Sequence, residues 1–189
     1  MKKAISLYGV SLAKQLAFTA VFAALCCVGT LLITIPLPAS GFFNTGDVFV
    51  LLSGWFLGPL YGAVAAAVGS ALADVIAGWA IYAPATFVVK GVDALLAYTV
   101  CALLKKLIKK ETLDFLPRAL SAVVGEAFMV LGYFLFETVL YGFVGAAPNV
   151  VGNVLQGVCC LLLATVLVSA LRPVKAVRQF FPLLAAEKK

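Results

Sequence analysis

Apolar segments long enough to cross a bilayer follow one another along most of the chain. A membrane-spanning helix needs roughly 20 predominantly apolar residues, and residues 14–35 form one such run, which Pro36 and Pro38 end. Because hydrocarbon offers no hydrogen-bond partners, a chain that crosses it must fold as helices or as a closed barrel. The apolar runs lack the strict alternation of barrel strands, so the sequence predicts an all-α membrane protein.

The composition excludes an ordinary soluble domain. Of the 189 residues, 64% are hydrophobic and 12% are charged, the mean hydropathy is +1.13, and there is no histidine. A soluble domain is about half apolar and a quarter charged. The apolar segments are also too many for one cleaved signal peptide. The cysteines lack the spacing of metal ligands, so we expect no metal and no other cofactor.

Six transmembrane helices in one compact bundle fit the apolar runs and their breaks. Gly58-Pro59 and Ala83-Pro84 favour helix starts, because proline lacks an N–H and fixes φ. A Gly-Ala-Ala-Pro turn at 145–148 divides the last run. The third helix is rich in glycine and alanine, which favours a central position. In a single domain over 1–189, the expected helices are about 14–35, 47–58, 60–80, 84–104, 116–141 and 147–171.

Basic residues collect in three blocks at the ends of apolar segments, which is a topology signal. Lys and Arg accumulate in cytoplasmic loops, so we expect the N-terminus, the 105–118 loop and the C-terminus in the cytoplasm. The net charge of +6 therefore indicates a multi-pass protein of the bacterial plasma membrane, not a nucleic-acid partner. The blocks are Lys2, Lys3 and Lys14; Lys105, Lys106, Lys109, Lys110 and Arg118; and Arg172, Lys175, Arg178, Lys188 and Lys189.

A few polar residues interrupt the apolar segments and are the candidate site. A charged side chain at membrane depth costs roughly 3 kcal/mol, so it usually faces a bundle interior, a cavity or a partner. Two expected helices each place three polar residues on one face, and further polar residues lie between 42 and 93. The predicted substrate-binding residues are Asn44, Asp74, Tyr82, Lys90, Glu126, Tyr133, Glu137, Asn149, Asn153 and Gln156.

A structural interpretation of these residues stays open beside the functional one. The polar groups could satisfy one another and fix the helix register, with Lys90 paired to Asp74, Asp93 or Glu126. Asn149 could cap a helix beside Pro148. Several ionisable groups at depth nevertheless favour a ligand site or a transport pathway.

Residues 36–47 form the longest expected non-helical piece at the outer surface. The segment contains proline, glycine and the aromatic pair Phe42 and Phe43. Such a pair is costly in water, so we expect the segment to act as a lid over an opening rather than as a plain connector.

A stripe of small residues lies on one face of the first expected helix. Ala13, Ala17, Ala20 and Ala24 recur every three or four positions, and small residues allow another helix to approach closely. The stripe fits packing inside this protein and docking of a separate membrane subunit equally well.

Four segments of the chain carry a resemblance to a known family. They are N-T-G-D-x-F-V-L-L at 44–52, L-G-P-L-Y-G at 57–62, G-S-A-L-A-D at 69–74 and Y-A-P-A-T-F-V-V-K-G at 82–91. Together they resemble the S component of energy-coupling factor (ECF) vitamin transporters. The chain is most similar to the riboflavin-type group, which also holds proteins assigned to pyridoxine or hydroxymethylpyrimidine.

The resemblance implies partners and a transport cycle. An S component captures a vitamin from outside and associates with a transmembrane coupling subunit and two cytoplasmic ATPases, which use the ATP. It is thought to tip over in the membrane to deliver its site inward. In that family small residues on the first helix contact the coupling subunit. Ala20 and Ala24 match the AxxxA spacing best, and Ala13 and Ala17 are a second match.

We expect a ligand of pyridoxine or hydroxymethylpyrimidine size, with riboflavin as the second choice. Carboxylates of the candidate set would accept from ring hydroxyls, and its lysine and amides would donate to ring atoms. No nucleophile–histidine pair or phosphate-binding loop is present in the sequence, so an enzyme is not expected. The alternative function is a stand-alone proton- or ion-coupled carrier that uses Glu126, Glu137 and Asp74 as its relay.

Overall fold

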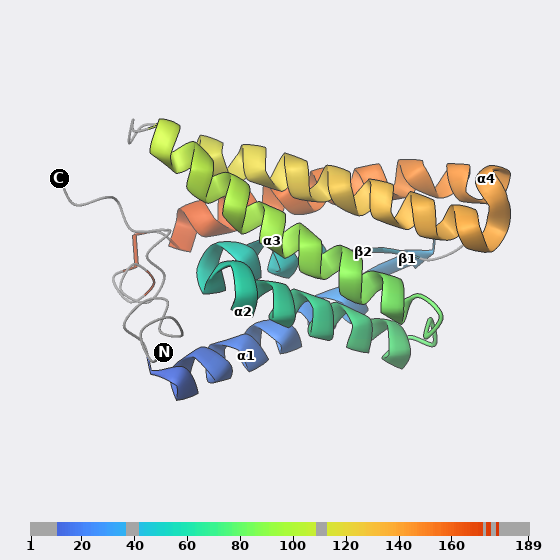
Figure 1. Cartoon of the computed structure of the whole chain (residues 1–189), viewed down its shortest axis with the longest axis horizontal. Coiled ribbons are helices and arrows are strands. Elements are labelled where there is room, and N and C mark those ends of the chain that lie inside the picture. Colours follow the sequence, from blue (N-terminus) through green and yellow to red (C-terminus); the bar gives the residue numbers. More distant parts are fainter. Residues whose placement is uncertain (1–10, 37–41, 109–112, 172, 175–176, 178–189) are drawn as a thin grey trace.

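The computed structural model describes residues 11–36, 42–108, 113–171, 173–174 and 177. Within these residues, four helices and one short hairpin form an elongated bundle (Figure 1). All four helices are long and apolar enough to span a membrane. The elements are α1 (Leu12–Leu32), β1 (Thr34–Pro36), β2 (Phe42–Asn44), α2 (Gly46–Ile76), α3 (Ala83–Leu107) and α4 (Phe115–Leu171).

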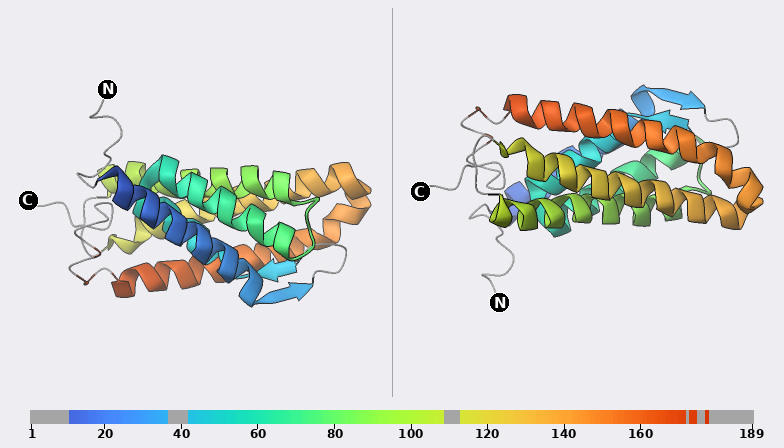
Figure 2. Two further views of the ribbon diagram at one scale, coloured as in Figure 1. Left: turned by 90° about the horizontal axis from the view of Figure 1, so that it is seen from below. Right: turned by 90° about the horizontal axis from the view of Figure 1, so that it is seen from above.

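Two of the helices are interrupted once, each at a glycine with positive φ. In α2 the break is at Gly58, with φ 83°, and Pro59 follows it. In α4 the break is at Gly142, with φ 75°, and the helix folds back on itself there (Figures 1 and 2). The breaks predicted at Gly58-Pro59 and before Pro84 are confirmed. The count of six separate helices is not supported: the structure has four helices, and each of the two interrupted ones consists of two segments joined at its glycine.

Three predicted boundaries are wrong, and glycine geometry explains two of them. The turn expected at 145–148 is helical, and the chain reverses at Gly142 instead. The helix expected to end near residue 80 ends at Ile76, because Gly78 adopts φ 84° and its N–H caps the Val75 carbonyl. The first helix ends at Leu32 rather than at 35, because strand β1 begins at Thr34.

The hairpin was not predicted. Strands β1 and β2 pair antiparallel, with Thr34 opposite Asn44 and Pro36 opposite Phe42. The segment expected as a lid, 36–47, therefore contributes the end of β1, the whole of β2 and the first residues of α2. Its remaining part, 37–41, lies outside the described residues.

The beginning of α1, the end of α3 and both ends of α4 lie at one end of the bundle, and the hairpin and the reversal of α4 lie toward the other (Figure 1). Lys105 and Arg118 lie at that first end and both pair with Asp114, at 3.4 and 2.8 Å. The other basic residues of the predicted topology signal, apart from Lys14 and Lys106, lie outside the described residues: Lys2, Lys3, Lys109, Lys110, Arg172, Lys175, Arg178, Lys188 and Lys189.

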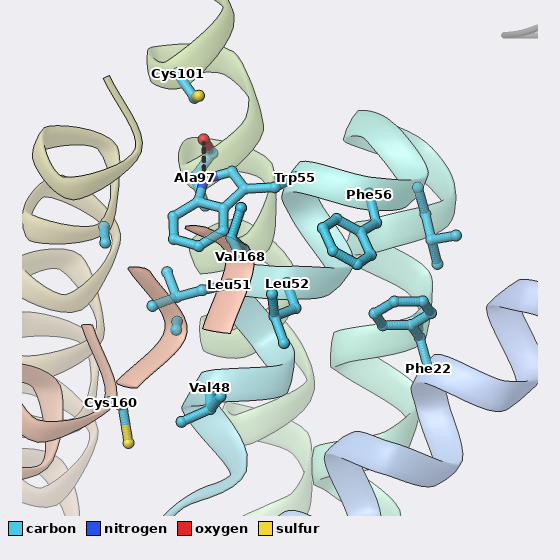
Figure 3. Close-up of a cluster of buried hydrophobic side chains, with 14 residues drawn as sticks. Phe22, Val48, Leu51, Leu52, Trp55, Phe56, Ala97, Cys101, Cys160 and Val168 are labelled. Carbon is cyan, nitrogen blue, oxygen red and sulfur yellow. Dashed lines mark hydrogen bonds between the residues drawn. The ribbon is translucent and has the colours of Figure 1, made fainter. Parts of the chain in front are cut away.

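The first segment of α2, residues 46–57, is the best-enclosed part of the fold. Every residue in it except Phe49 is buried. Trp55 projects between neighbouring helices, and its indole N–H lies 3.1 Å from both the Ala97 carbonyl and the Ser121 hydroxyl (Figure 3). The second segment of α2, expected at the centre, buries one face, which includes Ala66 and Ala73, and exposes another, as at Leu60 and Leu72.

Close helix packing depends on glycines in α2. A Cβ on Gly54 would lie 2.3 Å from the Ala94 carbonyl oxygen of α3. A contact this short with a backbone atom forces the two helices apart, and overpacking of this kind costs about 1–3 kcal/mol. We therefore expect Gly54→Ala to lower the melting temperature of the purified protein.

Gly91→Ala is the matched control for Gly54→Ala. A Cβ on Gly91 would lie 3.3 Å from the Ala67 side chain, a contact that small shifts relieve. Its free energy of unfolding should stay within about 1 kcal/mol of that of the parent protein, because alanine also favours the helix. Equal melting temperatures for the two variants would show that α2 and α3 are less closely packed than described.

Candidate functional site

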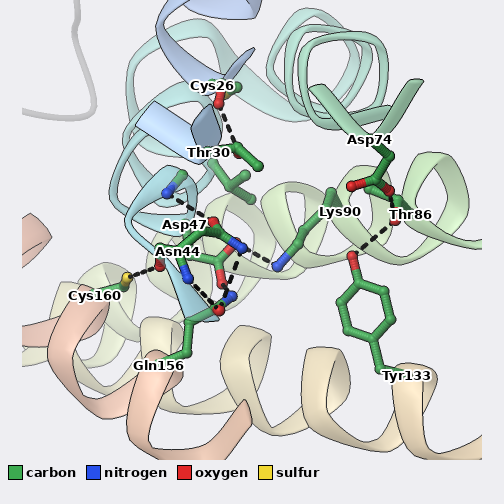
Figure 4. A network of polar contacts seen from close by, with 12 residues as sticks. Cys26, Thr30, Asn44, Asp47, Asp74, Thr86, Lys90, Tyr133, Gln156 and Cys160 are labelled. Atoms are coloured by element: carbon green, nitrogen blue, oxygen red, sulfur yellow. Dashed lines mark hydrogen bonds and ion pairs between the residues drawn. The ribbon is translucent and has the colours of Figure 1, made fainter. Parts of the chain in front are cut away.

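A buried polar network joins the hairpin to three helices (Figure 4). Lys90 of α3 forms an ion pair with Asp47 of α2. The other Asp47 oxygen accepts a hydrogen bond of 2.6 Å from the Gln156 amide of α4. All three side chains are buried. Since a buried charge is tolerated only when it is paired and hydrogen-bonded, this network holds the three helices in one register.

Asn44 attaches the hairpin to the same network. Its backbone N–H and its side-chain amide donate to Gln156 Oε1, at 2.8 and 3.3 Å. Its own Oδ1 accepts from the Gly46 N–H at 2.9 Å, at the first turn of α2. The Cys160 thiol lies 3.5 Å from the Asn44 carbonyl. Strand β2 is thus held against the second segment of α4 by the amide of Gln156.

A second cluster lies beside the first. The Thr86 hydroxyl of α3 donates to Asp74 of α2 and lies 3.0 Å from the Tyr133 hydroxyl of α4. The Lys90 ammonium lies 5.2 Å from the centre of the Tyr133 ring, within the range of a cation–π contact. Tyr133 therefore connects the two clusters, as Figure 4 shows.

A third cluster lies one helical turn further along the first segment of α4. The Tyr82 hydroxyl donates to Glu137 Oε1 at 3.3 Å, and the Asn149 amide is hydrogen-bonded to the same carboxylate. The Tyr82 ring packs edge-on against Trp79 and Phe136. Tyr82 and Asn149 are both buried, so neither is a simple interface anchor or an exposed cap.

Two buried carboxylates lack partners among the residues that the structure describes. Asp93 is completely buried against Gly125, where a Cβ would lie 2.2 Å from its Oδ1. Glu126 is 5% exposed, and like Asp93 neither of its oxygens has a hydrogen-bond partner in the described chain. Buried oxygen atoms normally accept a hydrogen bond, and for these two carboxylates the described residues provide no donor.

The structure brings most of the predicted site residues into contact and separates others. Asn44, Lys90 and Gln156 share the first cluster. Asp74 and Tyr133 lie in the second cluster. The third cluster contains Tyr82, Glu137 and Asn149. Asn153 is buried on the same α4 segment as Gln156. Glu126 belongs to none of the three hydrogen-bonded clusters; it lines a groove between the two segments of α4, within electrostatic range of Asp47 and Lys90.

Two residues of these clusters were missing from the predicted set. Asp47 lies in the apolar stretch between 42 and 93, but the sequence did not identify it as the partner of Lys90. Thr86 was not considered, although it precedes Lys90 by four residues and so shares its helix face. A search for polar residues on the face of Lys90 would have found it.

The alanine stripe lies on the outer side of α1. Ala13, Ala17, Ala20 and Ala24 are all exposed, while the side of α1 that packs on the bundle carries other residues, Phe22 and Cys26 among them. The described part of the chain therefore does not use these alanines for its own packing.

No metal centre is present among the described residues, where His, Cys, Asp and Glu form no group of three that could hold an ion. The cysteines are free thiols, and four of the five are buried. Their burial fits the role of small apolar packing residues.

The chain is similar to a known protein family and to a curated protein. A protein-family model described as "ECF-type riboflavin transporter, S component" matches residues 11–173. A curated protein of Pyrococcus woesei, described as an uncharacterized protein in a gap 3' region, is 37% identical over 139 residues, which cover 72% of this chain and 86% of that protein. The family match spans all the helices and every cluster described above.

Proposed function

Because the chain belongs to the family of S components of ECF-type riboflavin transporters, we propose that it captures a water-soluble vitamin outside the cell and delivers it inward. The family is one of substrate-binding transporter subunits and not of enzymes. The apolar helices agree with a multi-pass membrane protein. The proposal takes the membrane to be the bacterial plasma membrane.

The observation that carries the proposal is the buried network of Lys90, Asp47 and Gln156. A membrane protein that needed only helix register could use fewer and uncharged groups, because each charge at depth is costly. Gln156 of the network also accepts hydrogen bonds from Asn44 of the hairpin. A ligand that competes for Gln156 would therefore change how strand β2 is held against α4. This coupling is what a capture site with a lid requires.

We favour pyridoxine or hydroxymethylpyrimidine as the ligand. The available groups are one ammonium, several amides and several carboxylates, a set suited to a small ring with hydroxyl or amine substituents. Asp93 offers two acceptor oxygens without donors among the described residues. Riboflavin is the second candidate, favoured by the description of the family.

A thermal-shift and mass-spectrometric screen of the purified protein against water-soluble vitamins and their precursors tests the proposal. A ligand that binds the folded protein raises its melting temperature. We expect one vitamin to do so and to be found in the co-purified material. If no vitamin shifts the melting temperature in detergent or in nanodiscs, the proposed capture site is wrong.

The proposed partners are a transmembrane coupling subunit and two cytoplasmic ATPases. Four exposed alanines on α1 offer a smooth face on which another helix can pack closely. Lys105, Lys106 and Arg118 lie at the end of the bundle where α3 ends and α4 begins. Basic residues favour the cytoplasmic side, so we assign that end to the cytoplasm and the hairpin to the outside.

Asn153→Ala should weaken vitamin binding without unfolding the protein. Asn153 is buried one turn before Gln156, and losing one hydrogen bond costs about 1 kcal/mol, or roughly fivefold in Kd. Isothermal titration with the vitamin found in the screen measures the change. Thr138→Ala is the control, since within the described part of the chain the Thr138 hydroxyl bonds the Phe134 carbonyl of its own helix; equal Kd values for both variants would remove Asn153 from the site.

A further inference from the structure

A groove runs between the two segments of α4 on the outer side of the bundle. It has a volume of about 350 Å³, which is within the range of small-molecule sites. Val123, Val154 and Val158 of its lining are exposed. In a chain that spans the membrane, these side chains face lipid, so the groove opens into the hydrocarbon and not into water.

Glu126 is the one ionisable residue in the lining. The other lining residues are Val123, Ala127, Val130, Val154, Gly157, Val158 and Leu161. The Glu126 carboxyl is nine-tenths buried, and neither oxygen has a hydrogen-bond partner in the described part of the chain. An unpaired carboxyl at this depth is costly, and a ligand that carries a hydrogen-bond donor would remove that cost.

Gly157 leaves room for the carboxyl. A Cβ at this position would lie 3.0 Å from the Glu126 Cβ and 3.2 Å from its Oε2. Any larger residue would press on the Glu126 side chain and fill the floor of the groove. The groove and its acidic group therefore depend on the same close approach of the two α4 segments.

We propose that this groove is a second binding site, for a membrane-dissolved primary amine with a long alkyl chain. The alkyl chain lies along the valines and Leu161, and the nitrogen donates to the Glu126 carboxyl. The chemistry of the lining favours this ligand, because an apolar trough with one unpaired carboxyl group complements an apolar body whose one polar group carries N–H donors. The groove opens toward lipid on the outer side of the bundle, whereas the Lys90 network lies inside it, within electrostatic range of Glu126.

A zero-length cross-link tests the proposal. The full chain in phosphatidylcholine nanodiscs is mixed with dodecylamine and dicyclohexylcarbodiimide. The carbodiimide adds to the protonated Glu126 carboxyl and forms an O-acylurea. The unprotonated amine then attacks the carbonyl carbon, an amide forms, and dicyclohexylurea leaves with the proton from nitrogen. We expect mass spectrometry of the digested protein to find the dodecyl amide on Glu126.

Two variants that each replace a valine by tryptophan distinguish a reaction in the groove from non-specific reaction of Glu126 in lipid. Val158→Trp fills the groove from an exposed position, whereas Val166→Trp places the same side chain on the same segment outside it. The amide should be lost in Val158→Trp and kept in Val166→Trp. Equal yields in the two variants, or no amide in the parent protein, would overturn the proposal. Suppression of the amide by pyridoxine, hydroxymethylpyrimidine or riboflavin would overturn it too, by assigning Glu126 to the vitamin site.

Discussion

Replacing Lys90 by methionine should lower the free energy of unfolding by about 3–5 kcal/mol, the usual cost of removing one partner from a buried ion pair. Methionine keeps much of the length of the lysine stem but leaves the Asp47 carboxylate buried with only the Gln156 amide as a partner. Thermal unfolding in detergent, followed by tryptophan fluorescence, measures the loss. Trp55 is buried in the core on the same segment of α2 as Asp47, so its emission reports on the opening of the bundle.

Removing both charges should restore much of that stability. In Lys90→Met/Asp47→Asn no carboxylate is left unpaired, and an asparagine oxygen still accepts from Gln156. Replacing a buried pair as a whole is often close to neutral. The double variant should therefore unfold at a higher temperature than Lys90→Met alone, although it carries one more substitution.

Lys105→Met is the control for a surface pair. Lys105 lies 3.4 Å from Asp114, and both side chains are partly exposed. A pair of this kind contributes about 0–1 kcal/mol. If Lys90→Met cost no more than Lys105→Met, the Lys90–Asp47 pair would have to be accessible to water, and the arrangement of α2 against α3 would need revision.

The sequence predicted helix boundaries correctly where a residue such as proline permits only one backbone geometry. Proline after Gly58 and after Ala83 marks a helix start whatever the tertiary structure, and both starts are present. The reversal in α4 was misplaced because Gly142 and Gly145 both allow positive φ. Only the packing of the two α4 segments chooses between them. The short hairpin was missed because a strand of three residues is too short to show an alternation of apolar and polar side chains.

The sequence predicted which helix faces carry the polar residues of the site, but not which of these residues pair with one another. Polar residues at helical spacing identified Gln156 and Asn153 as inward-facing, because inward burial is the only tolerable position for such groups in lipid. The partner of Lys90 is 43 residues away in sequence, and Asp74, Asp93 and Glu126 were equally good candidates on charge alone. The helix register selects Asp47, and single-helix periodicity cannot give the register between helices.

Enlarging two alanines on α1 should abolish vitamin transport and leave vitamin binding unchanged. Ala20 and Ala24 are exposed and lie four residues apart, so their side chains share one outward face of the helix. Close helix packing in membranes needs small residues at the contact. Leucine at both positions would hold a coupling subunit away from α1. It would not disturb the clusters around Lys90, which lie inside the bundle.

Uptake and binding must be measured on the same variants to make this prediction decisive. Ala20→Leu/Ala24→Leu and the control Ala147→Leu, an exposed alanine on α4, are each reconstituted with the coupling subunit and ATPases, and vitamin uptake is followed with and without ATP. The double variant should keep the Kd of the parent protein but lose ATP-dependent uptake, whereas the control should keep both. Uptake by the isolated chain without ATPases, driven by a pH gradient, would instead identify a stand-alone carrier. Normal ATP-driven uptake by the double variant would place the partner on a face other than α1. These outcomes differ because the alanine stripe affects only docking, while the buried network affects only capture.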